Sequence, residues 1–325
     1  MDRVDAFLER AGWAEGKRLP LAGDASARRY ERITGTPPAV LMLTCPGEEL
    51  DRFLHMTNWL ASQGFSVPQI YAQDLSQGLL LLEDLGDDLI ARLVAQDPAR
   101  EAELYGLITE VLVGLRDCAP PEGLAELDAK GLADLTALTE EWYPCAARPE
   151  LSTAVRRAFA RVDDGQRVVS LRDFHAENAL LLAEREGVAR LGLLDYQDAV
   201  LAHPAYDLVS ALQDARREVS RETEAAQIAF YCRKTAQNAD VFSAIYACLG
   251  AQRALRILGI FVRLCLGAGK PRYLEFMPRV WAHLQHNLTH PALSELRDEV
   301  LRTMPAPDAP LIEEIRLQCA TRPIA

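Results

Sequence analysis

Three apolar runs, each ending in polar residues, stand out near the middle of the chain. They cover residues 167–171, 179–183 and 188–194, and their length and composition are typical of β-strands. The segment 184–187 between the second and third runs is mostly charged and ends in a glycine, which predicts a β-hairpin. The third run would therefore fold back along the second.

Polar side chains occupy the ends of these expected strands. Asp173, His175 and Asn178 lie between the first and second runs, and Asp195 follows the third. The hairpin would place Asp195 beside the loop that carries Asp173 and Asn178. Two carboxylates and a carboxamide in one small volume are the oxygen ligands that suit Mg²⁺, which takes its remaining ligands from water and phosphate. The pattern therefore predicts a magnesium-dependent site.

Before this central stretch, the first 83 residues show mainly short strands. Alternating or continuous apolar runs bounded by turn residues predict strands, and spacings of three and four predict helices. The expected elements are a helix at 4–11, strands on both sides of a turn at 23–26, a strand at 39–43, a helix at 48–63, and a strand pair at 69–72 and 78–83.

From residue 84 onward the spacing of apolar residues is mostly helical. The expected helices cover 89–118 with a break near Pro98, 132–142, 151–162, 225–232, 241–267, 277–288 and 312–317. Arg253, Arg256 and Arg263 interrupt one apolar helix; we interpret most of them as solvated or paired with acids, and one of them could face an acidic sugar. His203 is interpreted as a packing or capping residue.

The order Asp173-x-x-x-x-Asn178, hairpin, strand ending in Asp195 resembles the catalytic core of the protein-kinase-like phosphotransferases. In detail the stretch is similar to the aminoglycoside phosphotransferase branch. It is most similar to bacterial cell-wall-recycling kinases that phosphorylate N-acetylmuramate and N-acetylglucosamine at the anomeric hydroxyl. The residues that indicate this subgroup are 171–175, Leu-Arg-Asp-Phe-His, where most of the branch has His-Gly-Asp.

The resemblance implies an α+β, bilobal, protein-kinase-like fold. Residues 1–83 would form a small β-rich lobe that covers the nucleotide, and residues 84–325 a larger, mainly helical lobe with the catalytic loop and the substrate site. The implied cofactors are ATP and Mg²⁺. The implied reaction is transfer of the γ-phosphoryl group to a sugar hydroxyl, most simply the anomeric hydroxyl of the two amino sugars.

The resemblance also assigns roles to single residues. Asp173 would accept a hydrogen bond from the substrate hydroxyl, and Asn178 and Asp195 would hold the metal. Structural support of the catalytic loop would come from His175 and Asp207. The adenine edge would bind to backbone groups near Glu83 and Leu85.

The segment expected to cover the ATP phosphates departs from the kinase pattern. Ser26, Arg28 and Arg29 are the candidate phosphate-binding residues, since small residues at 23–26 let backbone N–H groups approach phosphate oxygens. Where the pattern has a strand lysine, this chain has Met42. Either arginine is a candidate for the missing charge, because a guanidinium binds phosphate bidentately. Glu49, on the next helix, is the one candidate for the glutamate that would pair with that lysine, and it is interpreted rather as a solvated first-turn acid.

Candidate substrate contacts are less well marked. Trp142 and Tyr143 follow two acids at a helix end and could stack on a sugar, although such aromatic residues are more often packed on a core. The three residues after Asp195 are added as candidates, namely Tyr196, Gln197 and Asp198. The gap between Asp195 and Asp207 has no room for a peptide-docking segment, so we expect a small-molecule acceptor.

Composition limits the partners and the compartment. The 325 residues contain 35 Lys and Arg against 47 Asp and Glu, a net charge of −12, which argues against a nucleic-acid or anionic-membrane partner. The seven cysteines are scattered without a C-x-x-C pair, so neither a disulfide framework nor a zinc site is expected. Neither a signal peptide nor a run of about 18 apolar residues is evident, and we expect a cytoplasmic protein. The oligomeric state is not predicted.

Three alternatives remain open from the sequence. The acceptor could be an aminoglycoside, choline or a homoserine-type amine, and the acidic surface suits a basic substrate. The chain could be a catalytically silent nucleotide-binding regulator, which Met42 suggests. A purely structural helical protein would leave Asp173, Asn178 and Asp195 unexplained.

Overall fold

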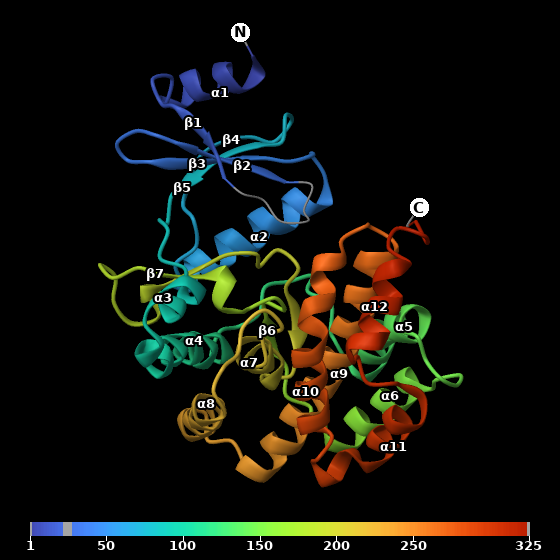
Figure 1. The fold of residues 1–325 in the computed structure, drawn as a ribbon. Coiled ribbons are helices and arrows are strands. Elements are labelled where there is room, and N and C mark those ends of the chain that lie inside the picture. Colours follow the sequence, from blue (N-terminus) through green and yellow to red (C-terminus); the bar gives the residue numbers. More distant parts are fainter. Residues whose placement is uncertain (1, 22–27, 324–325) are drawn as a thin grey trace. The chain divides into compact units, whose positions relative to one another are not determined.

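The computed structural model describes residues 2–21 and 28–323. The chain divides into two compact units (Figure 1). The first unit contains Met1–Pro98 and Ala176–Ala199, and the second contains Ala99–His175 and Val200–Ala325. The sequence predicted a division by function, with a nucleotide-covering lobe up to residue 83 and a lobe with the catalytic loop and the substrate site after it. This division stays a prediction.

An antiparallel five-stranded sheet forms the body of the first unit, in the order β1-β2-β3-β5-β4. The strands are β1 (Arg18–Pro20), β2 (Arg29–Ile33), β3 (Ala39–Leu43), β4 (Ile70–Asp74) and β5 (Leu79–Glu83), and the helices beside them are α1 (Arg3–Ala11) and α2 (Glu48–Ser62). Residues of α1, such as Phe7, pack against Ile33, Leu41 and Leu81. Because successive side chains of a strand point to opposite faces, Met42 points away from α1, to the face where α2 lies (Figure 1).

The remaining part of the first unit is the predicted hairpin, which pairs β7 (Ala179–Leu181) antiparallel with β8 (Leu191–Leu193). Its strands are shorter than the apolar runs, because Gly187–Arg190 forms a 3₁₀ turn. The hairpin also hydrogen-bonds to the earlier chain on both sides: Leu193 N donates to Ser66 O at 2.8 Å, and Leu181 N to Asp88 O at 2.8 Å. These bonds join residues 176–199 to the first unit. Helix α3 (Ile90–Gln96) packs beside β7.

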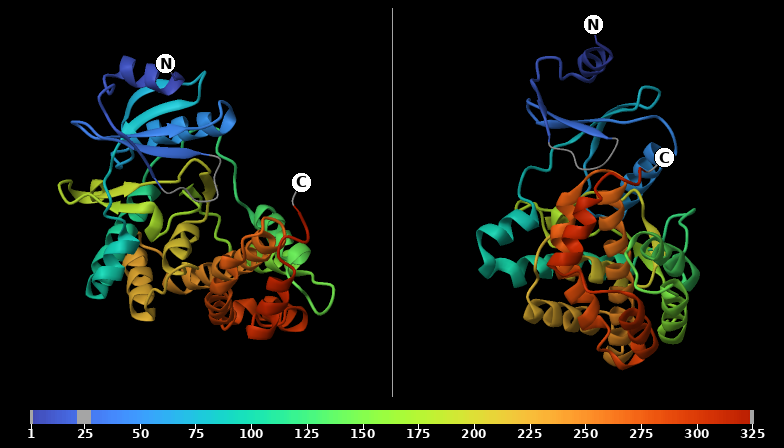
Figure 2. Two further views of the ribbon diagram at one scale, coloured as in Figure 1. Left: turned by 45° about the horizontal axis from the view of Figure 1, so that its top comes forward. Right: turned by 45° about the vertical axis from the view of Figure 1, so that its right-hand side comes forward.

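Helices make up most of the second unit. They are α4 (Glu101–Arg116), α5 (Ala129–Trp142), α6 (Leu151–Val162), α7 (Ala205–Leu212), α8 (Arg221–Lys234), α9 (Ala239–Leu266), α10 (Met277–Asn287), α11 (Ser294–Thr303) and α12 (Ala309–Leu317). Strands β6 (Val168–Ser170) and β9 (Val200–Ala202) pair antiparallel. Figure 2 shows α9 in the middle of this unit, and α5, α6, α7 and α10 pack against it.

Helix α9 is long and apolar enough to cross a membrane, but 83% of its apolar window is buried. That burial is typical of the core helix of a soluble protein. Gly259 lets α9 approach α5 closely, since a Cβ atom there would lie 2.8 Å from the backbone N of Thr139. The Thr139 hydroxyl donates to Leu255 O at 2.6 Å across the same contact.

The sequence pattern did not predict α7, α11 or β9. All eight residues of α7 are buried, so no polar face reveals the helical period. Helix α11 has only three buried residues, too few for a clear apolar stripe. The three-residue strand β9 is recognisable only through its pairing with β6. These elements depend on tertiary contacts rather than on a local pattern.

Candidate active site

The hairpin brings two predicted metal ligands together within the first unit. Leu194 N donates to Asn178 O at 3.0 Å, which extends the β7–β8 ladder by one step. The Asn178 Nδ2 atom then lies 3.4 Å from Asp195 Oδ2. In this orientation the amide nitrogen faces the carboxylate, and rotation of the carboxamide would present its oxygen to a cation instead.

Asp195 has a φ of +59°, in the left-handed region that L residues rarely adopt. Its second oxygen, Oδ1, accepts a hydrogen bond from Gln197 Nε2 at 2.8 Å. No group of three or more His, Cys, Asp or Glu side chains suited to a metal occurs among residues 2–21 and 28–323. A carboxylate and a carboxamide alone suit Mg²⁺, which keeps several waters and binds substrate phosphates. The donor set therefore fits the predicted metal.

The other two candidates after Asp195 have different surroundings. Tyr196 is fully buried: its hydroxyl shares a 2.8 Å hydrogen bond with Thr57, and its ring stacks on Phe53 at 5.6 Å. Asp198 forms an exposed ion pair with Arg52 at 3.4 Å. These contacts favour a packing role for Tyr196, whereas Gln197 contacts the Asp195 carboxylate.

In the second unit, Asp207 holds the backbone just before Asp173. Its carboxylate accepts hydrogen bonds from Ser170 Oγ at 2.7 Å, from Leu171 N at 2.6 Å and from Arg172 N at 2.9 Å. Asp207 is only 3% exposed, and burial raises the pKa of its carboxyl, although these hydrogen bonds oppose the rise. These contacts are the ones that a structural role for Asp207 requires.

The carbonyl of Arg172 is held from the other side by α9 and α7. It accepts hydrogen bonds from Arg253 Nη1 at 3.1 Å and from Ser210 Oγ at 3.0 Å. The Arg253 guanidinium also lies 4.7 Å from the centre of the Tyr206 ring. Most of the three helix arginines were interpreted as solvated or paired with acids, but Arg253 is buried against the backbone just before Asp173. The one sign of this burial in the sequence is that Arg253 lies within an otherwise apolar helix.

Arg172 itself has a φ of +69°. The peptide groups on both sides of this residue are the ones that Asp207, Ser210 and Arg253 bind. Because a left-handed conformation is unfavourable for an L residue, these bonds are needed to hold it. Asp173, the next residue, is exposed. His175, the other predicted support, lies with its Nε2 atom 3.4 Å from Arg216 Nη1.

Ser26 lies outside the described residues. The two phosphate candidates that are described differ: the Arg28 side chain is 5% exposed and pairs with Glu49 at 2.7 Å, whereas Arg29 is 74% exposed and pairs with Glu31 at 3.3 Å. Glu49 lies in the first turn of α2 with 46% of its side chain exposed, as the sequence indicated, and it also forms an ion pair with a buried guanidinium. That contact joins residues 21 positions apart, which no local pattern reveals.

The two candidates for binding the adenine edge, Glu83 and Leu85, are held by the sheet and the hairpin. Glu83 N donates to Gln69 O at 2.7 Å, and the Glu83 carboxylate pairs with Arg185 of the hairpin at 2.5 Å. Leu85 approaches Gly192, where an added Cβ atom would lie 3.0 Å from Leu85 Cδ1. The side chain of Glu83 is thus engaged, so any contact with adenine would use backbone groups.

Trp142 and Tyr143 are packed inside the second unit. The Arg322 guanidinium lies 4.0 Å from the centre of the Trp142 ring, and the Tyr143 hydroxyl donates to Pro305 O at 2.7 Å. Both side chains are buried. These contacts favour the packing alternative that the sequence left open, so neither residue is among our proposed substrate contacts.

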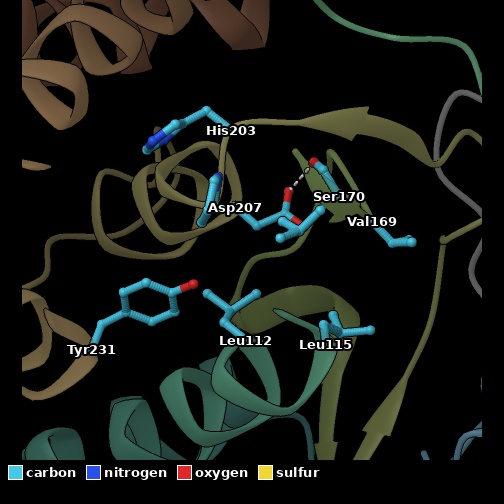
Figure 3. Close-up of a pocket in the computed structure, with 9 residues that line it drawn as sticks. Leu112, Leu115, Val169, Ser170, His203, Asp207 and Tyr231 are labelled. Atoms are coloured by element: carbon cyan, nitrogen blue, oxygen red, sulfur yellow. Dashed lines mark hydrogen bonds between the residues drawn. The ribbon is translucent and has the colours of Figure 1, made fainter. Parts of the chain in front are cut away.

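A small pocket in the second unit adjoins the Asp207 carboxylate (Figure 3). Leu112 and Leu115 supply apolar walls, and Ser170, His203 and Tyr231 supply polar groups. The cavity has room for about one water molecule, so it is not a substrate site.

His203, at the edge of this pocket, accepts a hydrogen bond from Ala205 N through Nδ1 at 3.1 Å, and its Nε2 lies 3.2 Å from Asp164 Oδ1. These contacts agree with the predicted packing or capping role. Burial, opposed by Asp164 and Asp163, lowers the pKa of His203 to about 4 from its ordinary 6.5.

We expect His203 to make the protein less stable as the pH falls from about 6.5 toward about 4. In this range the unfolded chain binds a proton at His203 that the folded chain does not, so the free energy of unfolding falls by about 1.4 kcal/mol per pH unit. His203→Asn keeps an acceptor for Ala205 N. When the pH is lowered from 7 to about 5, the free energy of unfolding measured with urea should fall in both proteins. The fall should be roughly 2 kcal/mol smaller in the His203→Asn variant than in the unaltered protein. An equal fall in both proteins would contradict this assignment.

Comparison with known proteins identifies the family. Residues 17–242 match the phosphotransferase enzyme family. The N-acetylmuramate/N-acetylglucosamine kinase of Caulobacter vibrioides is 37% identical, over 90% of this chain and 93% of that protein. The kinase of the same name from Pseudomonas aeruginosa is 30% identical, over 90% of this chain and 91% of that protein.

Solved structures show the same fold at lower identity. A choline/ethanolamine kinase family protein from Mesorhizobium loti superposes with a TM-score of 0.62 at 15% identity, over 93% of this chain and 98% of that one. The predicted α+β, protein-kinase-like fold and the family resemblance carried by residues 171–195 are both confirmed. The chain therefore belongs to the phosphotransferase enzyme family, whose reaction is ATP-dependent transfer of a phosphoryl group to a hydroxyl.

Proposed function

We propose that this protein transfers the γ-phosphoryl group of Mg-ATP to the anomeric hydroxyl of N-acetylmuramate and N-acetylglucosamine. The observation that carries the chemistry is the pairing of Asn178 with Asp195 at the end of the β7–β8 hairpin. The acceptor is supported by two relatives named as kinases of these amino sugars, each matched over 90% of this chain. No comparable relative favours an aminoglycoside, choline or homoserine acceptor.

In this mechanism the chain supplies positioning and charge. Asn178 and Asp195 hold Mg²⁺, which when bound neutralises charge on the phosphate oxygens. Asp173 accepts a hydrogen bond from the acceptor hydroxyl and orients it for in-line attack. Asp207, Ser210 and Arg253 keep the backbone before Asp173 in place. An anomeric hydroxyl suits this arrangement because the ring oxygen makes it more acidic than other sugar hydroxyls.

Further assignments belong to the same proposal. Residues 1–83 cover the nucleotide, with the adenine bound by backbone groups near Glu83 and Leu85, and residues 84–325 carry the acceptor. The protein works in the cytoplasm on a small molecule, without a nucleic-acid or membrane partner. The burial of α9 argues against a membrane-spanning role, and the net charge of −12 argues against a nucleic-acid or anionic-membrane partner.

The test is phosphoryl transfer from Mg-ATP to N-acetylmuramate, N-acetylglucosamine, kanamycin, choline and homoserine. We expect transfer to the two amino sugars only, loss of transfer when the metal is chelated, and no transfer by Asp195→Ala. A product that is phosphorylated at the anomeric position no longer reduces alkaline copper, which identifies the reacting hydroxyl. Transfer to kanamycin or choline instead would replace the proposed acceptor. ATP-dependent thermal stabilisation without transfer to any of the five would favour a silent regulator.

A further inference from the structure

Strand β3, where the kinase pattern has a phosphate-binding lysine, carries no cation (Ala39–Leu43). Met42 stands at the expected position and is fully buried. In protein kinases that lysine also pairs with a glutamate of the following helix, and both members of the pair must be in place. This chain has an acid at the start of the following helix, Glu49 of α2, but no lysine opposite it.

The register of the sheet shows which side chain lies near the Met42 position. Tyr30 of β2 is the direct cross-strand partner of Met42. Arg28 precedes Tyr30 by two residues, so along an extended strand its side chain points to the same face. A diagonal neighbour of this kind lies about 7–8 Å from Met42, which is within the length of an arginine side chain.

The contacts of Arg28 point in the same direction. Its Nη2 donates to Glu49 Oε1 at 2.7 Å, although Arg28 and Glu49 come from different elements. The guanidinium carbon lies 5.7 Å from the centre of the Phe53 ring, one turn further along α2. Burial raises the pKa of the Tyr30 hydroxyl, and a hydrogen bond with the Arg28 side chain opposes this rise. The guanidinium is thus fixed on the α2 face of the sheet, in the same unit as a proposed metal ligand.

The neighbouring arginine does not share these properties. Arg29 is directly opposite Leu43 in the register and points to the other face of the sheet. It is largely exposed, and its ion pair is with Glu31 on its own strand. An exposed arginine of this kind loses side-chain entropy whenever it binds a ligand, whereas Arg28 is already ordered.

We propose that Arg28 and Glu49 together replace the strand lysine and helix acid of the kinase pattern, with Arg28 binding an ATP phosphate and Glu49 orienting it. This proposal rests on the proposed function for the identity of the ligand. An arginine suits the site because its guanidinium carries five N–H donors, so it can donate to Glu49 and to phosphate oxygens at once. A lysine at the start of β2 would present a single point of charge.

The first test compares Arg28→Met with Arg29→Met and with a matched control, Arg10→Met, in which an exposed arginine of α1 loses its ion pair with Asp74. We expect Arg28→Met to weaken Mg-ATP affinity and to lower kcat/KM for ATP by about 10²-fold. Arg29→Met should change either quantity by less than about threefold, and Arg10→Met by less still. Calorimetric titration with a non-hydrolysable ATP analogue gives the affinity even if no acceptor is found, so failure of this proposal is distinguishable from failure of the proposed function.

The second test restores the charge from the position of the missing lysine. In the double variant Arg28→Met, Met42→Lys, the new ammonium can approach Glu49 from β3. This variant should bind Mg-ATP at least about tenfold more tightly than Arg28→Met alone. Glu49→Gln alone should give an intermediate loss, since the guanidinium remains but is less well oriented. Arg28→Met with unchanged nucleotide affinity, or a loss in Arg29→Met as large as that in Arg28→Met, would overturn the proposal.

Discussion

Asp173→Asn should lower kcat by about 10²–10⁴-fold while leaving the affinity for Mg-ATP nearly unchanged. The substitution keeps the size of the side chain but replaces an acceptor oxygen with an amide that cannot take up a proton, and a positioned base of this kind contributes about that much to a rate. Asp173 is exposed, so the fold should tolerate a change that keeps the size of the side chain. Single-turnover kinetics with saturating acceptor measures the chemical step directly.

Glu184→Gln is the matched control, since it also converts an exposed carboxylate to a carboxamide, in the turn of the β7–β8 hairpin. Its kcat should equal that of the unaltered protein. Turnover by Asp173→Asn within threefold of the unaltered rate would exclude Asp173 from orienting the hydroxyl. A large loss of ATP affinity in that variant would instead mean that the carboxylate acts on the nucleotide.

Asp207→Asn should reduce both stability and turnover. The carboxylate accepts bonds from Leu171 N on one oxygen and from Ser170 Oγ and Arg172 N on the other. An asparagine has one acceptor oxygen, so one of these buried groups would face an NH₂ group. Losing a charge-assisted bond and leaving a buried donor without an acceptor costs about 3 kcal/mol. Urea denaturation should show this loss.

The turnover of Asp207→Asn should fall by about 10²-fold at a temperature where the variant is still folded, because Asp173 follows directly on the backbone that Asp207 holds. Its KM for ATP should change much less than kcat. Asp134→Asn is the control in the same unit: it removes an exposed partner of Lys130 at 2.6 Å and should leave stability and rate unchanged. Full activity of folded Asp207→Asn would show that the loop does not need this carboxylate.

The elements that the sequence predicted well have strong local patterns. The apolar run at Ala39–Leu43 corresponds to β3 residue for residue, and the polar segment before Gly187 correctly indicated the hairpin that joins Asn178 to Asp195. In the hairpin, a few residues with a clear alternation or turn signal determine which groups meet. The pattern within this short segment was therefore enough to predict that two proposed metal ligands lie close together.

The contacts that were not predicted join distant parts of the chain. Arg253 lies 81 residues from the carbonyl that it binds, and nothing in the spacing of α9 distinguishes it from Arg256. The choice between Arg28 and Arg29 required the β2–β3 register, since a shift of one residue would exchange their faces. Such contacts depend on packing and strand register, and neither can be predicted from the local pattern of a single sequence.

Arg172 has a further consequence for how relatives of this chain are found. Most of the branch has glycine at this position, and glycine adopts a φ of +69° without steric cost, whereas an L residue loses about 1–2 kcal/mol. Sequences with glycine at this position and sequences with another residue there therefore share a backbone conformation. In this chain it is held by a buried aspartate 35 residues later. A motif search written with an obligatory glycine before the aspartate discards chains of this kind. A search that allows any residue there, but requires the later aspartate, retains them.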